Sequence, residues 1–447
     1  LNTGTVDNKL HGAGNSFSVA GKRPETNRFM MNGVDYLGDN ATGQQIAPIG
    51  SSGYLLGVDA VREYNVLGHT YGAEYGKRAG GQISVVTSSG TNQLHGTVFE
   101  YLRNDKLDAR NFFDDEVAPF KRNQFGGSLG GPIIRDKMFV FGNYEGFRER
   151  LGVSRNVVVP NLLARSGQLP CNVVHTTASA RAANCGTSLN DLNAYIPVPG
   201  RVPGMLPFLN HYWPAPNGGD EFTPDGLATG TARYRANPGR PANEDFGLAR
   251  YDYNISNSDS LSTNFTVSRG EIQQVADNPL FVGVQPKDLY TISVQETHIF
   301  SPTVLNVALF GWTRARGANG GNQIAGGTPD NLLLMSGGDR NNPGAFTLGG
   351  GATTNVVTGI VGANGNNFHF NKRQNFTGSN DLRMTVGRHN LSMGVWFMKV
   401  QQTAFSSAQN TAGTASYAGL VAFLTDNPTQ FLGAVNPQPL DFRSTQA

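Results

Sequence analysis

Alternating apolar and polar residues predict long β-strands from His95 onward. Between Leu261 and Ser268 the odd-numbered residues are Leu, Thr, Phe and Val, and the even-numbered residues are Ser, Asn and Thr. This two-residue period predicts a strand with one apolar face and one polar face. A β-sandwich needs a dry inner face, whereas a membrane barrel has lipid outside and a polar lumen inside. The pattern therefore favours a barrel wall.

Nine segments carry strand patterns, and the connections between them alternate in length. The predicted strands are residues 95–103, 123–132, 137–149, 244–254, 260–269, 289–300, 303–316, 373–385 and 388–401. Very short turns alternate with long connections at 104–122, 151–243, 270–288 and 317–372. Short turns on one rim and long loops on the other are typical of bacterial outer-membrane barrels, and ten-residue strands match the tilted span of a bilayer.

Composition agrees with a chain of strands and turns. The 447 residues include 57 Gly, and 10% are aromatic and 15% charged, against about 25% charged in typical soluble domains. The net charge of +2 gives no electrostatic case for binding nucleic acid. No run of 18 apolar residues occurs, which excludes a spanning helix but leaves a spanning barrel open.

Residues 1–92 are polar and glycine-punctuated, which predicts a small mixed domain before the strands. Asn32-Gly33 is a tight-turn dipeptide, because both residues tolerate positive φ. The segments GKRPETNRFMMNGVD (21–35) and AVREYNVLGHTYGAEYGKRAGGQISVVTSSGTNQLH (60–95) resemble the plug, and the entry into the barrel, of TonB-dependent outer-membrane transporters. The subgroup is that of the Oar-like receptors, which carry a carboxypeptidase-regulatory-like domain upstream. The resemblance spans residues 16–150, and Asn32 stands where the subgroup usually has an aspartate.

The resemblance implies a mainly β fold, a partial transmembrane antiparallel β-barrel with a small globular plug domain. Residues 1–92 would be the C-terminal part of the plug and 93–447 the N-terminal part of the barrel, with the four long connections extracellular. A complete plugged barrel has about 22 strands, so we expect an internal fragment of a longer protein that forms an open, curved sheet.

The implied function is TonB-dependent active transport of a scarce solute across the outer membrane of a Gram-negative-type bacterium. The extracellular loops and the plug apex would bind the solute, and a rearrangement of the plug would release it. The implied partners are a TonB-type energy-coupling protein, which would pull on a segment missing from this chain, the solute, and outer-membrane lipid. Two alternatives stay open: a structural, adhesive or protein-export role for the same barrel, and a secreted soluble β enzyme.

Candidate site residues follow from this interpretation. Polar groups that would face each other across the lumen are Arg23, Glu25, Arg28, Asn32, Asp35, Glu63, Glu74, Arg250 and Asp252. Candidate solute contacts in the loops are His211, Tyr212 and Trp213, together with the Asn-rich residues 364–367. Aromatic and amide side chains suit sugars or peptides. In an exported chain, Cys171 and Cys185 would form a disulfide inside the longest loop.

Motifs for catalysis or cofactors are missing from the sequence. The glycine-rich residues 126–131 lack the Lys-Ser/Thr of a phosphate-binding loop and precede a strand rather than a helix. No HExxH metal motif or catalytic triad stands out among the eight His residues. We therefore predict no enzyme activity, no cofactor, no catalytic residue and no metal site.

Overall fold

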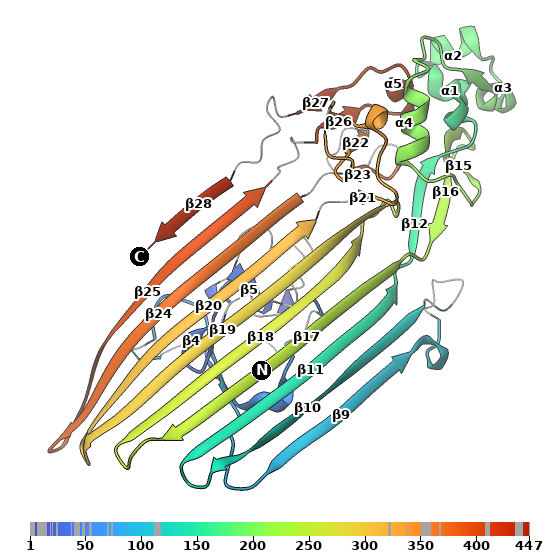
Figure 1. The fold of residues 1–447 in the computed structure, drawn as a ribbon. Coiled ribbons are helices and arrows are strands. Elements are labelled where there is room, and N and C mark those ends of the chain that lie inside the picture. Colours follow the sequence, from blue (N-terminus) through green and yellow to red (C-terminus); the bar gives the residue numbers. More distant parts are fainter. Residues whose placement is uncertain are drawn as a thin grey trace.

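A long antiparallel meander is the main sheet of the computed structural model (Figure 1). The structure describes residues 5–6, 16–17, 19, 21–23, 26–36, 38–39, 45–46, 50–52, 56–68, 71–72, 75–110, 117, 119–320, 323–336, 338–349, 359–365, 368–406, 412–433 and 441–446. The main sheet contains β9 (His95–Asn104), β10 (Phe120–Ile134), β11 (Met138–Gly152), β17 (Gly239–Asn254), β18 (Asp259–Val275), β19 (Phe281–Ser301), β20 (Val304–Gly320), β24 (Phe368–Val386), β25 (His389–Ser406) and β28 (Asp441–Gln446).

Each of the nine predicted strands corresponds to one strand of this sheet, β9 to β25. Neighbours in the sequence are neighbours in the sheet, and β9 and β28 form its two edges without pairing to each other. The mainly β fold and the open, curved sheet are confirmed. No helix in the described part of the chain is long and apolar enough to span a membrane.

The strands run further than the sequence pattern predicted at the end opposite the short hairpins. Residues 270–288 were expected to form a long loop, yet β18 continues to Val275 and β19 already begins at Phe281. The two strands pair without interruption from Asp259↔His298 to Val275↔Val282. The loop between them is therefore a tight connection on top of an extended hairpin.

The two faces of the main sheet differ as the alternation predicted. On β18 the inward side chains of Asn264, Thr266 and Ser268 are buried, whereas the outward Phe265 is 41% exposed. On β25 the outward Phe397 is 65% exposed. Lipid contact explains an exposed apolar face that water would disfavour.

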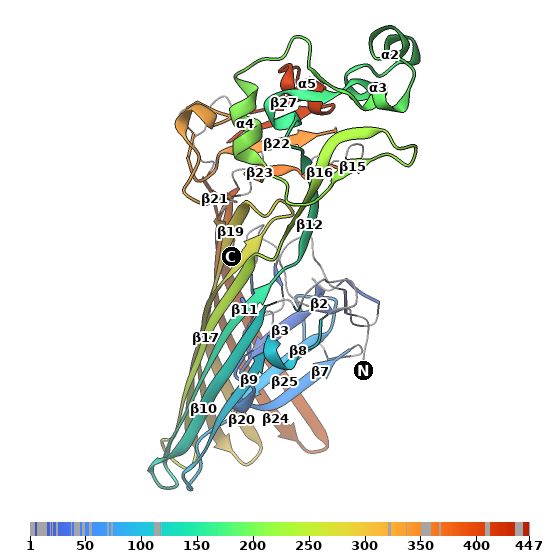
Figure 2. The ribbon, with the colours of Figure 1, turned by 90° about the vertical axis from the view of Figure 1, so that its right-hand side faces the viewer.

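The N-terminal domain, called the plug below, lies against the concave side of the main sheet (Figure 2). Its four-stranded sheet has the order β4-β3-β8-β7, with β3 and β8 parallel. These strands are β3 (Arg28–Met31), β4 (Val34–Asp35), β7 (Val61–Leu67) and β8 (Gln82–Thr87), and the short 3-10 helix η3 (Val58–Ala60) precedes β7. Two small pairs accompany it, β1 (Thr5–Val6) with β2 (Ser16–Phe17) and β5 (Gly38–Asp39) with β6 (Gln45–Ile46).

The predicted turn between β3 and β4 is present, with φ of 49° at Asn32 and 83° at Gly33. A small core then joins plug and wall, because Met31, Tyr36 and Val85 of the plug pack with Leu289 and Ala315 of the main sheet. The plug is thus seated on the polar face of the wall through a mixed interface.

The long connections fold together into one cap at the end of the sheet opposite the short hairpins (Figure 1). The cap consists of the described residues between 153 and 238, 323 and 365, and 412 and 433. Its elements are β12 (Arg155–Pro160), β13 (Gln168–Pro170), α1 (Cys171–Val174), α2 (Ala178–Asn184), α3 (Leu189–Asn193), β14 (Tyr195–Pro197), α4 (Met205–Tyr212), β15 (Asp220–Phe222), β16 (Ala228–Ala236), β21 (Gln323–Ile324), β22 (Gly344–Leu348), β23 (Ala363–Gly365), β26 (Thr414–Tyr417), α5 (Leu420–Leu424) and β27 (Gln430–Leu432).

A single hydrophobic core holds the cap together. Trp213, Phe346 and Phe423 come from three different connections and are each at most 1% exposed. Phe346 and Phe423 stack edge to face at 5.6 Å between ring centroids, and Trp213 and Phe423 do the same at 5.6 Å. The connections therefore form one packed unit rather than separate loops.

Candidate functional site at the interface of plug and wall

A buried charge cluster lies where β3 and β4 of the plug meet the wall. The Asp35 carboxylate accepts a hydrogen bond from Arg28 Nε at 2.8 Å and pairs with Lys77, and Asp35 has no exposed surface. Burial alone would raise the pKa of Asp35, but Lys77 and Arg28 outweigh it and hold the pKa below its usual value. The tight turn at Asn32 brings Asp35 and Arg28 together, because it folds Asp35 back beside the strand that carries Arg28.

The wall covers this cluster with an aromatic ring. The Arg28 guanidinium lies 5.4 Å and the Lys77 ammonium 6.0 Å from the ring centre of Trp396 on β25. Lys77 Nζ also lies 3.3 Å from the sulfur of Met398. Cation–π attraction strengthens when the cation is desolvated, so the charges of the plug are partly satisfied by the wall itself.

Two buried glutamates of the wall accept hydrogen bonds from the backbone of the plug. The amide of Ser52 donates to Glu244 Oε2 at 2.8 Å, and the amide of Gly57 donates to Glu145 Oε2 at 2.7 Å. Ser268 of β18 completes the first site by donating to Glu244 Oε1 at 2.7 Å. Both glutamates are 1% exposed. Charge-assisted bonds of this kind are stronger than neutral ones, so these residues anchor the plug.

The end of β8 is held by a third group of wall residues. Arg250 Nη1 donates to the carbonyl oxygen of Thr87 at 2.8 Å, while Arg250 also pairs with Asp252 at 2.8 Å. The Thr87 hydroxyl donates to Asn264 Oδ1 at 3.0 Å, and Asn32 donates to the same hydroxyl at 3.1 Å. One threonine thus links the β3–β4 turn of the plug to two strands of the wall.

Two glycines allow the backbones to approach closely. Gly311 of β20 faces Val34 of the plug, and any larger residue at 311 would overlap with the Val34 side chain. Gly57 of the plug has φ of 85°, and a Cβ there would overlap with the ring of Phe246 on β17. At these points the interface has no room for water or for a side chain.

The predicted lumen residues divide into three groups. Arg28, Asn32, Asp35, Arg250 and Asp252 are brought together within the plug–wall interface, as described above. Arg23 and Glu63 are instead exposed. Glu25 and Glu74 lie outside the described residues.

Sequence reasoning missed the two wall glutamates, although a signal existed. Glu244 has the same strand parity as Arg250 and Asp252, which were recognised as lumen residues. Glu145 faces inward on the neighbouring strand, where its partner across the pair is Phe246. If the alternation of β17 is continued from Arg250 back to Glu244, and then carried to the paired strand β11, both glutamates are identified as lumen carboxylates.

The structure contradicts two of the three aromatic loop candidates. Tyr212 and Trp213 are fully buried in the cap core. The indole of Trp213 donates to the Val361 carbonyl at 2.7 Å, and the hydroxyl of Tyr212 donates to the Leu332 carbonyl at 2.9 Å. Both residues therefore stabilise the cap and present no surface to a solute.

The remaining loop candidates, His211 and residues 364–367, provide little evidence for a solute site. His211 is partly buried, and its Nε2 lies 3.1 Å from the Thr328 hydroxyl. Burial lowers the pKa of His211. For the Asn-rich residues 364–367, residues 366 and 367 and the side chains of 364 and 365 lie outside the described part of the structure.

A cavity of about 610 Å³ in the described part of the chain offers another candidate for solute contact. It opens where the cap meets the upper ends of β18 and β19, and its volume lies in the usual range for small-molecule sites. Its lining consists of Gln273, Val282, Val284, Gln323, Ile324, Ala325, Gly326, Gly327, Arg340 and Asn341. Amide and guanidinium groups beside small apolar residues suit a polar, neutral or anionic solute.

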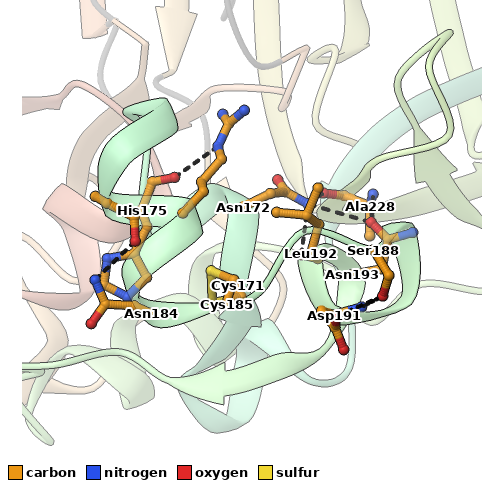
Figure 3. The surroundings of a disulfide bond; sticks show 12 residues. Cys171, Asn172, His175, Asn184, Cys185, Ser188, Asp191, Leu192, Asn193 and Ala228 are labelled. Carbon is orange, nitrogen blue, oxygen red and sulfur yellow. Dashed lines mark hydrogen bonds between the residues drawn. A yellow bond between two sulfur atoms is a disulfide. The ribbon is translucent and has the colours of Figure 1, made fainter.

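The cysteines pair within the cap, as Figure 3 shows. The disulfide joins Cys171 at the start of α1 to Cys185 after α2, across a sequence separation of 14. Asn172 continues the link, since its side chain donates to the carbonyls of Leu192 and Ala228, both at 3.1 Å. The disulfide therefore joins α1 to α2, and Asn172 links α1 to the start of β16.

Two clusters bring possible metal-ligand atoms within 4.8 Å of one another in the described residues. One consists of Cys171, His175 and Cys185, whose sulfurs are already consumed by the disulfide. The other is Asp259, Glu296 and His298, in which Asp259 and His298 already form a 2.5 Å contact.

Comparison with known proteins gives this arrangement a family. Residues 86–447 match the family model of an outer membrane beta barrel domain. Over 135 residues, which are 28% of this chain and 12% of the relative, the sequence is 29% identical to the TonB-dependent transporter Oar of Myxococcus xanthus. The fold resembles that of the outer membrane transporter YddB from Escherichia coli, at TM-score 0.51 and 11% identity over 99% of this chain and 48% of YddB. The siderophore receptor PirA from Acinetobacter baumannii aligns at TM-score 0.44 and 12% identity over 90% of this chain and 44% of PirA.

The chain spans less than half the length of these relatives. The family model, however, matches well over half of the chain itself. The family model describes an outer membrane domain and the Oar relative is a TonB-dependent transporter, so the predicted family resemblance and the predicted location are confirmed. The chain therefore belongs to the family of outer membrane β-barrel domains, is similar in sequence to a TonB-dependent transporter, and resides in the Gram-negative outer membrane.

Proposed function

We propose that the protein containing this chain imports a solute by TonB-dependent active transport, and that the plug–wall interface is the moving part. The solute first contacts the cap, which lies at the end of the main sheet opposite the short hairpins. A TonB-type protein then pulls on a segment preceding the described plug. The plug shifts away from the wall and opens a path along the polar face of the main sheet.

The observation that carries this proposal is how the plug is attached. Its amides at Ser52 and Gly57 bind buried wall carboxylates, and Arg250 binds the end of β8. A hydrogen bond to a charged group contributes about 1.5–3 kcal/mol. A pulling force can break such bonds one after another, and the polar wall groups can then bind water or solute. A dry, apolar interface would not offer that exchange.

A reversible tether tests whether plug movement is needed for transport. Val34 and Gly311 are adjacent across the interface, because a Cβ at 311 would lie 3.1 Å from the Cβ of Val34. A disulfide needs a Cβ separation of about 3.5–4.5 Å, so the cysteine pair forms after β4 shifts outward by a few tenths of an ångström. The full-length protein, as wild type or Val34→Cys/Gly311→Cys, is expressed in its host lacking the native copy. Mass spectrometry then records which solutes each strain removes from a complex peptide and sugar medium.

We expect the wild type to deplete solutes that the deletion strain leaves behind. The tethered variant should lose this depletion under oxidising conditions and regain it after reduction, whereas the single variant Val34→Cys, which adds no bulk to the interface and cannot form the bond, keeps it. Depletion that continues in the oxidised double variant would contradict plug movement. If no solute distinguishes wild type from deletion strain and only surface attachment changes, the structural or adhesive alternative is favoured.

We also infer that the chain carries no enzyme activity. Charged side chains between plug and wall, such as Glu244 and Arg250, bind the backbone of the plug. The groups there act as anchors, and the chemistry they offer is hydrogen-bond exchange.

A further inference from the structure

A row of charged side chains crosses the outer face of the main sheet. It consists of Asp245, Arg269, Asp288, Arg316 and Lys372, and is called the outer charged row below. Strand register places each member directly opposite the next on β17, β18, β19, β20 and β24. The row therefore runs continuously over five strands, on the side away from the plug.

The alternation of side-chain direction along each strand shows that the row faces outward. Glu244 and Ser268, the sequence neighbours of Asp245 and Arg269, are buried toward the plug. Successive residues of a strand point to opposite faces, so the row points into the surroundings of the barrel. The exposed fractions agree, being 67% for the Arg269 side chain and 47% for that of Arg316.

The height of the row matches the edge of the membrane. Asp259, at the short hairpin, and Arg269 are ten positions apart on β18. At about 3.3 Å per residue and a tilt of about 40°, this separation corresponds to about 25 Å along the membrane normal, which is the height of the apolar band of such barrels. The outward residues in between include Leu261, Phe265 and Val267, which suit lipid tails. The row therefore lies where the headgroups of the outer leaflet begin.

The charges of the row are incompletely paired with one another. Arg269 and Arg316 flank Asp288 from either side at 3.7 and 3.5 Å. One carboxylate cannot accept from all ten N–H groups of two guanidiniums. Within two positions of the row, the outer face carries five basic side chains and four acidic ones, which are Arg148, Arg269, Arg314, Arg316 and Lys372 against Glu100, Asp245, Glu271 and Asp288.

We propose that the outer charged row binds the phosphate groups of phosphorylated lipids in the outer leaflet. Arg269 and Arg316 are the main contacts, because a guanidinium fork matches a phosphate and both side chains are largely exposed. Asp288 holds the two guanidiniums at a fixed spacing and competes with phosphate for them. The lipid tails then lie along the apolar band below. This inference concerns the lipid side of the wall and stands independently of solute transport.

The test measures lipid binding to the full-length protein in an uncharged detergent. Native mass spectrometry titrates the protein with diphosphorylated lipid A and, in parallel, with the same lipid after enzymatic dephosphorylation. The variant Arg269→Gln/Arg316→Gln removes two positive charges from the row. The matched control Arg135→Gln/Arg388→Gln removes two positive charges from exposed turns at the opposite rim. Resistance of the barrel to unfolding in SDS establishes that each variant is folded.

A basic residue near an anionic surface contributes about a fivefold gain in binding, so the double variant should bind diphosphorylated lipid about 25-fold more weakly. The control should bind as the wild type does, and Asp288→Asn should bind more tightly because it frees both guanidiniums. A purely structural role for the row would instead make Asp288→Asn weaker.

Four results would overturn the proposal. The first three are wild-type affinity in the double variant, equal binding of the dephosphorylated and phosphorylated lipids, and weaker binding by Asp288→Asn. The fourth is displacement of the lipid by free phosphate. Inorganic phosphate at the concentration of the lipid should not displace it. Displacement would show that the row binds free phosphate rather than a lipid headgroup.

Discussion

Replacing Asp35 by Asn tests the buried charge cluster of the plug. The substitution keeps the volume but leaves Arg28 and Lys77, whose side chains are 8% and 18% exposed, without their carboxylate. Breaking a buried pair costs about 3–5 kcal/mol. The partial exposure of Lys77 favours the lower end, near 3 kcal/mol. Since about 1.4 kcal/mol is a factor of ten, local opening of the plug should rise by about 10²-fold.

Hydrogen exchange of the full-length protein measures this effect. Peptides covering β3, β4 and β8 should exchange about 10² times faster in Asp35→Asn, while peptides from β18 and β19 keep their rates. The matched control is Asp245→Asn, which breaks an ion pair with Arg148 on the outer face and should cost at most about 1 kcal/mol. Unchanged plug exchange in Asp35→Asn would refute the conclusion that the cluster stabilises the plug.

Acid should reproduce the substitution in the wild type. Lys77 and Arg28 outweigh burial and lower the pKa of Asp35 in the folded plug below its ordinary value of 3.8. The ionised carboxylate therefore stabilises the plug above pH 3.8, and this contribution is lost as the pH falls through the lowered pKa. Plug protection should fall with acid in the wild type and much less in Asp35→Asn. Parallel loss in both proteins would assign the acid sensitivity to other groups.

Three further predictions concern packing. Gly311→Leu introduces a side chain that overlaps with Val34 and should destabilise the seated plug by about 1–3 kcal/mol. Hydrogen exchange in β4 should accelerate, and an unchanged rate would show that Val34 does not pack against residue 311. Trp213→Ala should destabilise the cap by about 3–5 kcal/mol, which differential scanning calorimetry would detect as an earlier cap transition with the barrel transition unmoved. Replacing Cys171 and Cys185 by Ser should cost the cap about 3 kcal/mol and speed proteolysis between α1 and α3; equal cleavage rates would contradict a stabilising bond.

The wall was predictable because lipid and lumen impose a two-residue period on every strand that separates them. Leu261 to Ser268 shows this period, and the structure confirms its two faces. Beyond the membrane the same strands lose the contrast, since Gln273 and Gln274 stand side by side where a loop was expected. The alternation of apolar and polar residues therefore reflects the two environments of the strand, lipid and lumen, rather than strand propensity.

The cap and its core could not be predicted because they depend on distant contacts. Trp213 is buried by Phe346 and Phe423, which come from other connections of the chain. Nothing local to Trp213 distinguishes a core indole from an exposed one. An aromatic patch in a polar loop therefore suggested a solute contact when its actual role is packing.

The plug–wall site was predictable in part. Arg250 and Asp252 form their ion pair within one strand, so the sequence already placed them on one face. Glu244 follows from the same parity. Its partner, the Ser52 amide, lies 192 positions away in the chain, and only the three-dimensional seating of the plug brings the two together.

The most direct test of the account is whether the plug leaves the wall in energised cells. Ser51 is 3% exposed between plug and wall, so a Ser51→Cys variant of the full-length protein reports on separation when living cells receive a membrane-impermeant maleimide. Energy-driven movement of the plug predicts labelling in energised cells and little labelling after a protonophore or in cells without the TonB-type protein. Labelling that is equal in all three conditions would contradict an energy-driven movement of the plug.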